Sequence, residues 1–302
     1  MFYNLRKKLM KKIFDFRTNE IRNKSQITLE PESGFVILSQ LCDPDINMYL
    51  VALTSFTSFM KPKKVVVISD KLTDQNKAVL REHVQDIEIM PIENYRENKL
   101  PTGGTWERLI AIQRYSAESY VVQMDADIVV LDYPHEVADA IKDNVNFTMT
   151  SKIGFEKMSF INASYLVWER TMKHVQNLAE KAFRECRNPE ERLYIRGCSG
   201  FTGFAKGSFD IESLIEFSQE IEAKIGKDKW YEWGSEQVSS NYIVANSPHS
   251  VILPYEKYIF YEPGINEENI KVYHFIGTHR FKRGVYIRNA KRIIDKSIKE
   301  VL

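Results

Sequence analysis

The stretch Val121-Val122-Gln123-Met124-Asp125-Ala126-Asp127-Ile128-Val129-Val130 decides the fold class, because it places two carboxylates inside a run that is otherwise nearly all apolar. Such a run predicts a buried strand. Burying both carboxylates without a counter-charge would cost more than a strand contributes. A divalent cation solves this problem, since Mg²⁺ or Mn²⁺ takes oxygen ligands and can join carboxylates to phosphates. The alternative is that Asp125 and Asp127 only cap a turn at the end of a strand.

The residues before this stretch alternate between apolar runs and segments with helical spacing. The runs predict strands at 35–38, 65–68, 87–92 and 121–124. The segments between them predict helices at 45–60, 73–84 and 106–119, with Thr73 as a helix cap. Alternation of this kind indicates βαβ units, which build a parallel sheet covered by helices, with ligands at the carboxyl ends of the strands.

Beyond Asp127 the pattern is less regular. It predicts further strands at 147–150, 160–168, 196–206, 251–254 and 272–275, and further helices at 170–187, 211–225 and 235–245. The sequence contains no internal repeat and no flexible linker, so we expect the chain to have three parts. These are a basic amphipathic N-terminal helix (1–30), one catalytic domain (31–285) and a basic C-terminal helix (286–302). The expected fold class is α/β, with a mostly parallel central sheet flanked by helices.

Charge is unevenly distributed along the 302 residues. Lysine and arginine number 42 and aspartate and glutamate 41, yet residues 1–24 and 279–302 each carry eight basic and two acidic side chains. The body of the chain is therefore acidic, which argues against nucleic acid as a partner. Three scattered cysteines, Cys42, Cys186 and Cys198, do not form a disulfide framework, and no stretch of 18 apolar residues exists. We expect a cytoplasmic protein.

The two ends of the chain have amphipathic helical spacing. The apolar positions are Phe2, Leu5, Leu9, Ile13 and Phe16 at the start, and Ile287, Ala290, Ile294, Ile298 and Val301 at the end. A short basic helix of this kind can lie on an anionic membrane, or it can pack on the body of the protein. The sequence leaves both readings open, and the first would place the protein peripherally on the inner face of a membrane.

The segment at 272–282, Val-Tyr-His-Phe-Ile-Gly-Thr-His-Arg-Phe-Lys, contains further residues that suit the same chemistry. His274 follows a short strand, and a neutral imidazole can be a third metal ligand beside two carboxylates. Gly277 lets the backbone approach a diphosphate closely. Arg280 and Lys282 can neutralise that diphosphate as it leaves. A lone histidine is more often an ordinary core residue, but the adjacent glycine and cations favour the ligand role here.

Together with three further segments, these motifs resemble the metal-dependent nucleotide-sugar glycosyltransferases of the GT-A (Rossmann-like) fold. The closest likeness is to glycosyltransferase family 8, the glycogenin and bacterial lipooligosaccharide galactosyltransferase type. The further segments are 42–55, 106–109 and 236–241. The resemblance implies that Asp43, Asp45, Tyr49 and Arg108 contact the donor. It also implies that Asp125, Asp127 and His274 hold the metal, that Asp125, Gly277, Arg280 and Lys282 contact the donor phosphates, and that Gln237 lies at the reacting carbon.

The resemblance has gaps. Arg280 stands where the family has a lysine, Lys282 follows two residues later, and Val238 replaces an aspartate. Two segments of this chain, 160–164 and 198–201, could correspond to the acceptor strand of the family. The spacing to Glu236 favours the second segment, and therefore Ser199 and Gly200 as acceptor-binding residues. Trp233 offers a flat face for sugar stacking, although core or lid packing explains it equally well.

These observations predict a hexosyltransferase that moves a sugar from a UDP-sugar to a glycan or lipid-linked acceptor with Mn²⁺ or Mg²⁺, and the resemblance favours retention through Gln237. Glu236 could instead be a general base in an inverting reaction, or simply an acidic residue that suits a helix N-terminus. A sugar nucleotidyltransferase is disfavoured, because residues 41–45 are acidic and lack the glycine-rich loop it needs. A non-catalytic nucleotide-sugar or glycan-binding module is the remaining alternative.

Overall fold

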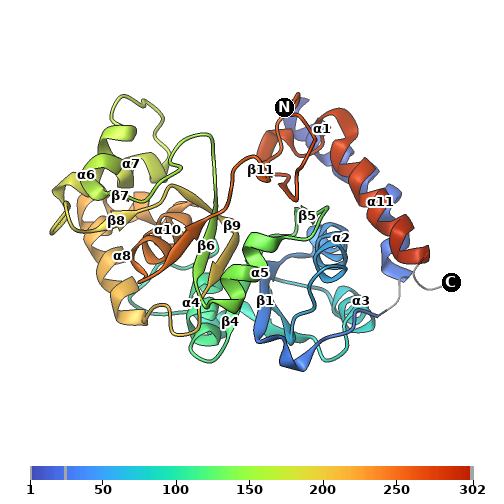
Figure 1. The fold of residues 1–302 in the computed structure, drawn as a ribbon. Helices are drawn as coiled ribbons and strands as arrows, with labels where there is room; N and C mark the ends of the chain where they lie inside the picture. The colour runs from blue at the N-terminus through green and yellow to red at the C-terminus, as the bar shows by residue number, and fades with distance from the viewer. Residues whose placement is uncertain (1, 24–25, 300–302) are drawn as a thin grey trace. The chain divides into compact units, whose positions relative to one another are not determined.

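The computed structural model describes residues 2–23 and 26–299 and has the predicted mixed α/β architecture (Figure 1). Seven strands make a mostly parallel central sheet that helices flank. The chain divides into two compact units. The first holds Met1–Met90, Met124–His135 and Glu256–Leu302, and the second holds Pro91–Gln123 and Glu136–Tyr255. The division into parts 1–30, 31–285 and 286–302 stays a prediction.

The first unit contributes three strands to the central sheet, at the positions that the apolar runs predict. Their order is β1 (Phe35–Leu41), β2 (Lys64–Ser69) and β3 (Glu88–Pro91). β1 and β2 are parallel, and every residue from Val65 to Ile68 is buried. Helices α2 (Ile46–Thr57) and α3 (Asp74–His83) connect the three strands. This arrangement confirms the predicted βαβ units.

The start of α3 is fixed by side chains. Thr73 Oγ1 accepts a hydrogen bond from the backbone N–H of Asn76, as the sequence predicts for a helix cap. Asp43, in the loop after β1, accepts from the backbone N–H of Thr73 and from Asn76 Nδ2 at 2.8 and 2.9 Å. The loop after β1 is therefore tied to α3.

A small sheet in the first unit carries the Asp-Ala-Asp segment. Its order is β11 (Tyr258–Phe260), β12 (Val272–His274) and β5 (Ile128–Val130), with β12 antiparallel to β5. α2 packs on β5, and Ser55 Oγ accepts from the backbone N–H of Val130 at 3.0 Å. β5 is thereby held at a defined position on the core helix.

The terminal helices α1 (Phe2–Thr18) and α11 (Val285–Lys299) lie side by side in the first unit (Figure 1). Phe14 is fully buried and its ring lies 4.4 Å from that of Tyr286. Leu9, Ile13 and Phe16, three of the predicted apolar positions, are instead exposed. The side chains of Phe2, Leu5 and Ile298, and the whole of Val301, lie outside the described part of the chain. Within the described residues, no helix has the length and apolar character to cross a membrane.

The second unit contributes four strands to the sheet. Their order is β10 (Ser250–Ile252), β6 (Asn146–Thr150), β9 (Gly197–Phe204) and β4 (Tyr120–Met124). β10 is parallel to β6, whereas β9 is antiparallel to it. A Cβ at Gly203 would come within 2.3 Å of the Phe147 ring, so this glycine permits the close approach of β9 to β6.

The helices of this unit complete the fold. They are α4 (Trp106–Ser116), α5 (His135–Lys142), α6 (Phe160–Leu166), α7 (Val175–Ala182), α8 (Ile211–Ile225), α9 (Lys227–Trp230) and α10 (Ser235–Asn246). Two short strands, β7 (Met158–Ser159) and β8 (Leu193–Tyr194), pair with each other.

Two predictions for this unit need correction. The strand predicted at 160–168 is helix α6, because Ser159 caps a helix by accepting from the N–H of Asn162. The helix predicted at 170–187 is shorter, since α7 begins only after His174 and ends at Ala182.

Candidate functional site

The pairing of β12 with β5 brings His274 to the two aspartates. His274 is opposite Ile128 in the antiparallel register, one residue from Asp127. The backbone N–H of Phe275 donates to the carbonyl of Asp127 at 2.9 Å, which continues the pairing by one step. The imidazole is therefore positioned by backbone hydrogen bonds between segments nearly 150 residues apart in sequence.

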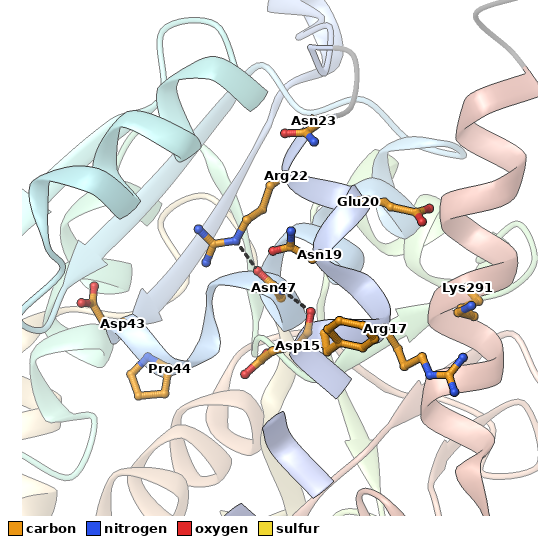
Figure 2. A pocket seen from close by; sticks show the side chains of 11 residues that line it. Asp15, Arg17, Asn19, Glu20, Arg22, Asn23, Asp43, Pro44, Asn47 and Lys291 are labelled. Carbon is orange, nitrogen blue, oxygen red and sulfur yellow. Dashed lines mark hydrogen bonds between the residues drawn. The ribbon is translucent and has the colours of Figure 1, made fainter. Parts of the chain in front are cut away.

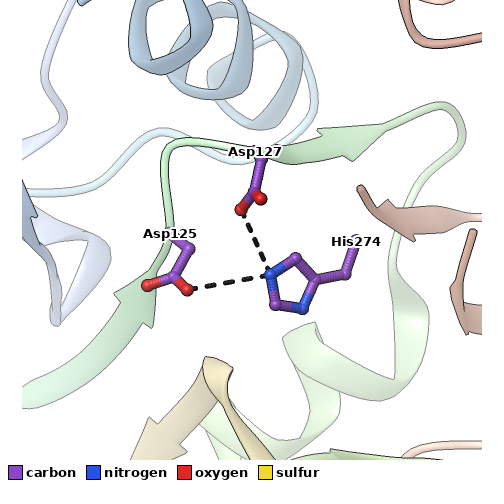
Figure 3. A group of neighbouring side chains, drawn as sticks. All are labelled: Asp125, Asp127 and His274. Carbon is purple, nitrogen blue, oxygen red and sulfur yellow. Dashed lines mark ion pairs between the residues drawn. The ribbon is translucent and has the colours of Figure 1, made fainter. Parts of the chain in front are cut away.

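Asp125, Asp127 and His274 form one cluster in the first unit (Figure 3). His274 Nε2 lies 3.1 Å from Asp127 Oδ1 and 3.7 Å from Asp125 Oδ2. One ligand atom from each residue lies within 4.8 Å of the other two. Asp127 and His274 are buried, whereas the Asp125 side chain is 32% exposed.

Arg280 also pairs with Asp127. Its Nη2 lies 2.5 Å from Asp127 Oδ2, and its Nε donates to the carbonyl of Phe275 at 2.8 Å. Burial would raise the pKa of Asp127, but His274 and Arg280 outweigh it and hold that pKa below its usual value. Burial would lower the pKa of Arg280, but Asp127 reverses this and raises it. Asp127 is thus a buried carboxylate kept in its charged form.

The donor atoms of this cluster fit a divalent cation. Two carboxylates and one imidazole supply oxygen and nitrogen ligands, a set that suits Mn²⁺ well. Mg²⁺ prefers oxygen ligands and near-ideal octahedral geometry, so His274 makes it the weaker fit. Asp125 is the most exposed of the three residues, so it is the one most accessible from solvent.

The segment after His274 supplies the predicted phosphate-binding residues. Gly277 has φ +55°, a conformation that strains any residue with a side chain, and it is exposed. Lys282 is exposed at its side chain, while its carbonyl accepts from Tyr261 Oη at 2.9 Å. Gly277 and Lys282 line a small pocket of about 180 Å³ together with Arg6 and Lys7 of α1. Three basic side chains thus surround this pocket, which suits an anionic group.

The predicted donor residues after β1 have separate surroundings. Asp43 lines an open pocket of about 710 Å³, in which Arg22 donates to Asn47 at 2.7 Å (Figure 2). Burial would raise the pKa of Asp43, but hydrogen bonds from Asn76 and Thr73 outweigh it and lower that pKa. The carboxylate of Asp43 therefore already has a structural use at the start of α3.

Asp45 and Tyr49 differ from Asp43. Cys42 Sγ donates to Asp45 Oδ2 at 3.1 Å, and burial together with Asp45 raises the pKa of that thiol to about 12. Asp45 is half-buried and near enough to Arg280 to raise its pKa. Tyr49 is completely buried in the core, so its side chain offers no surface to a nucleotide. Its predicted contact with the donor would need a rearrangement of α2.

A second cluster, in the second unit, contains Arg108, Ser199 and Glu236. Glu236 Oε2 accepts from Thr105 Oγ1 at 2.9 Å and from Ser199 Oγ at 3.0 Å, and it lies 3.4 Å from Arg108 Nη2. The side chains of Arg108 and Glu236 are only 4% and 2% exposed. Trp106 Nε1 donates to Ser235 at 2.8 Å, which fixes the start of α4 against the start of α10. Strand β9, the favoured acceptor candidate, thus reaches Glu236 through Ser199.

The remaining predicted residues lie close by in sequence. Gly200 is buried next to Ser199 on β9, and Trp233 is 72% exposed, with its ring 6.1 Å from that of His174. Gln237 is half-buried and donates from Nε2 to Gln176 Oε1 at 3.3 Å. Sequence reasoning missed Gln176, because nothing in the spacing of α7 links it to α10.

Comparison with solved structures supports the fold described above. No protein-family model matches the sequence, and no curated protein matches it either. Among solved structures, the bifunctional glycosyltransferase WbbM is 14% identical, with a TM-score of 0.51 over 89% of this chain. An active-site mutant of LgtC is 11% identical, with a TM-score of 0.52 over 86% of this chain and 95% of LgtC. This chain spans about half of WbbM, 52% of its length. The likeness shows the GT-A fold.

Proposed function

We propose that this chain is a metal-dependent glycosyltransferase that uses a UDP-sugar donor. The observation that carries the proposal is the Asp125, Asp127 and His274 cluster, whose ligand atoms lie within 4.8 Å of one another on a GT-A fold. These three residues would hold Mn²⁺ in preference to Mg²⁺, because one ligand is an imidazole. When bound, the cation supplies positive charge that stabilises the leaving diphosphate.

The chain's own cations have a complementary role in this proposal. Arg280 would leave Asp127 and pair with a phosphate oxygen, a partner that guanidinium binds well. Lys282 is exposed two residues after Arg280 and would neutralise the remaining charge of the diphosphate. The positive φ of Gly277 allows the turn that precedes both residues.

We propose retention of anomeric configuration, with Gln237 at the reacting carbon. Glu236 is a poor candidate for the base of an inverting reaction. Its Oε2 accepts from Thr105 and Ser199 and pairs with Arg108, and its side chain is 2% exposed. A general base must come within hydrogen-bond reach of the hydroxyl that it deprotonates. Gln237 is more accessible than Glu236, which supports the retaining alternative.

We further propose that the acceptor is a glycan or a lipid-linked sugar and that α1 contacts an anionic membrane. Leu9 and Phe16 are 57% and 82% exposed, on a helix whose Lys7, Lys8 and Lys12 are also exposed. An apolar stripe beside lysines suits the surface of an anionic bilayer, where each lysine contributes about 1 kcal/mol.

The test is nucleotide release from a panel of nucleotide sugars with Mn²⁺, with and without candidate acceptors. We expect UDP release by the intact protein, loss of more than about 100-fold in Asp127→Asn, and no loss in Asp132→Asn. Asp132 is an exposed aspartate of the same segment and serves as the matched control. Release that does not depend on metal, or that survives Asp127→Asn, would contradict the proposal.

A further inference from the structure

A buried carboxylate in the second unit is linked through Gln176 to the amide of Gln237, the residue proposed to act at the reacting carbon. Glu180 on α7 is completely buried. Its Oε1 accepts from Gln176 Nε2 at 2.9 Å and from Tyr194 Oη at 3.1 Å, and its Oε2 accepts from Arg196 Nε at 3.1 Å. Burial raises the pKa of Glu180, and Arg196 acts against that rise by supplying the counter-charge that a buried carboxylate requires.

This network fixes the direction of the Gln176 side chain. A carboxylate paired with a guanidinium only accepts hydrogen bonds, so Gln176 must present its NH₂ group to Glu180. Its carbonyl oxygen then points the other way, toward Gln237. Gln237 must in turn present its own NH₂ group to Gln176. The carbonyl oxygen of Gln237 is therefore directed away from Gln176.

We propose that Gln176 and Glu180 are positioning residues that set the orientation of the Gln237 amide. The inference rests on the proposed function, in which Gln237 lies at the reacting carbon. Positive charge develops on that carbon as its bond to the diphosphate oxygen breaks. A carbonyl oxygen stabilises this charge, whereas an NH₂ group in the same place opposes it. The chain from Arg196 through Glu180 and Gln176 thus selects the productive end of the amide.

Glu180→Gln tests this chain of hydrogen bonds. Arg196 still requires an acceptor, so the new amide turns its oxygen to Arg196 and its NH₂ group to Gln176. Gln176 then turns over, and the amide of Gln237 turns over with it. We expect kcat to fall about 10- to 100-fold, the usual cost of losing an outer-shell partner, while KM for the donor changes little.

The double variant Gln176→Glu/Glu180→Gln provides the rescue. The new carboxylate at position 176 accepts from both neighbours, so Gln237 again presents its NH₂ group inward. We expect kcat to return to within about threefold of the starting value. Tyr194→Phe is the matched control. It removes the hydrogen bond of Tyr194 to Glu180 and the 3.5 Å contact of Gln176 Nε2 with Tyr194 Oη, but Glu180 still accepts from Gln176, which keeps its direction. It should lower the melting temperature and leave kcat unchanged. Loss of kcat in Tyr194→Phe equal to that in Glu180→Gln would mean that the network only stabilises the fold.

Gln237→Ala separates this inference from the proposed function. Unchanged kcat in Gln237→Ala would overturn the role of Gln237 and the positioning with it. Loss of kcat in Gln237→Ala with full activity in Glu180→Gln would overturn the positioning alone. A second readout needs no turnover: in protein labelled with ¹⁵N-glutamine, the NH₂ resonance missing from Gln237→Ala identifies that side chain. We expect it to shift in Glu180→Gln and to return in the double variant, and an unmoved resonance would refute the inference.

Discussion

Replacing Glu236 by alanine should destabilise the protein strongly, because it removes a buried carboxylate that pairs with the buried Arg108 side chain. The two side chains are 2% and 4% exposed, and their charged atoms lie 3.4 Å apart. Removing one member of a buried ion pair costs about 3–5 kcal/mol, because the other charge stays desolvated. Thr105 and Ser199 also lose the oxygen to which they donate. For a chain of 302 residues, the melting temperature should fall by about 5–8 °C.

The assay is thermal unfolding followed by calorimetry, with Lys64→Ala as the control. Lys64 pairs with Glu88 at 2.9 Å, but these side chains are 46% and 29% exposed. Such a surface pair contributes less than about 1 kcal/mol, so the control should melt close to the unsubstituted protein. A Glu236→Ala variant that melts with the control would refute the electrostatic reasoning.

Glu236→Gln then separates structure from chemistry. The amide oxygen still accepts from Arg108, Thr105 and Ser199, but the side chain can no longer take a proton. If Glu236 has only a structural role, kcat should stay within a few-fold of its starting value. Loss of a general base lowers the rate by about 10²- to 10⁴-fold. A stable Glu236→Gln protein with such a loss would restore the inverting alternative.

Three further predictions concern the first unit. Arg280→Met should tighten Mn²⁺ binding about fivefold, because the metal no longer displaces the Arg280–Asp127 ion pair, which contributes about 1 kcal/mol. Electron paramagnetic resonance measures this binding, and unchanged or weaker binding would contradict the prediction. Burial lowers the pKa of His83 below about 6.5. The unfolded chain therefore takes up a proton first, and the free energy of unfolding should fall as pH drops from 7.5 to 5.5, less so in His83→Gln; an equal fall in both would refute it. Phe16→Glu should weaken binding to anionic liposomes, whereas Phe155→Glu, at another exposed aromatic side chain, should not; equal binding by both would remove α1 as the contact.

The sequence predicted the regular first part of the fold well, for a physical reason. The strands β1, β2 and β4 are mostly apolar, because neighbouring strands and helices remove most of their residues from water. Their period and their boundaries are therefore visible in the residues alone. The segment at 160–168 has no such clarity, since a short apolar run fits a strand or a helix equally well. Ser159 decides the matter locally, by capping α6.

The three residues of the candidate metal cluster could be predicted from the sequence, but the contacts of the neighbouring residues could not. Asp125, Asp127 and His274 were expected together, and the register of β12 against β5 brings them together. The ion pair between Arg280 and Asp127 depends on the turn at Gly277, a conformation that no periodicity encodes. Contacts that connect separate helices, such as those of Gln176, depend in the same way on tertiary packing.

Asp127 and Glu236 are both buried carboxylates matched by an arginine, yet their surroundings suit opposite uses. Arg108 is 4% exposed beside Glu236, so separating that pair would leave both charges desolvated. Arg280 is 24% exposed, and it meets Asp127 beside a neighbouring carboxylate that is 32% exposed. Its guanidinium can move to water or to a phosphate while a divalent cation takes its place. The buried pair therefore suits a fixed part of the scaffold, and the partly exposed pair suits a charge that is exchanged when donor and metal bind.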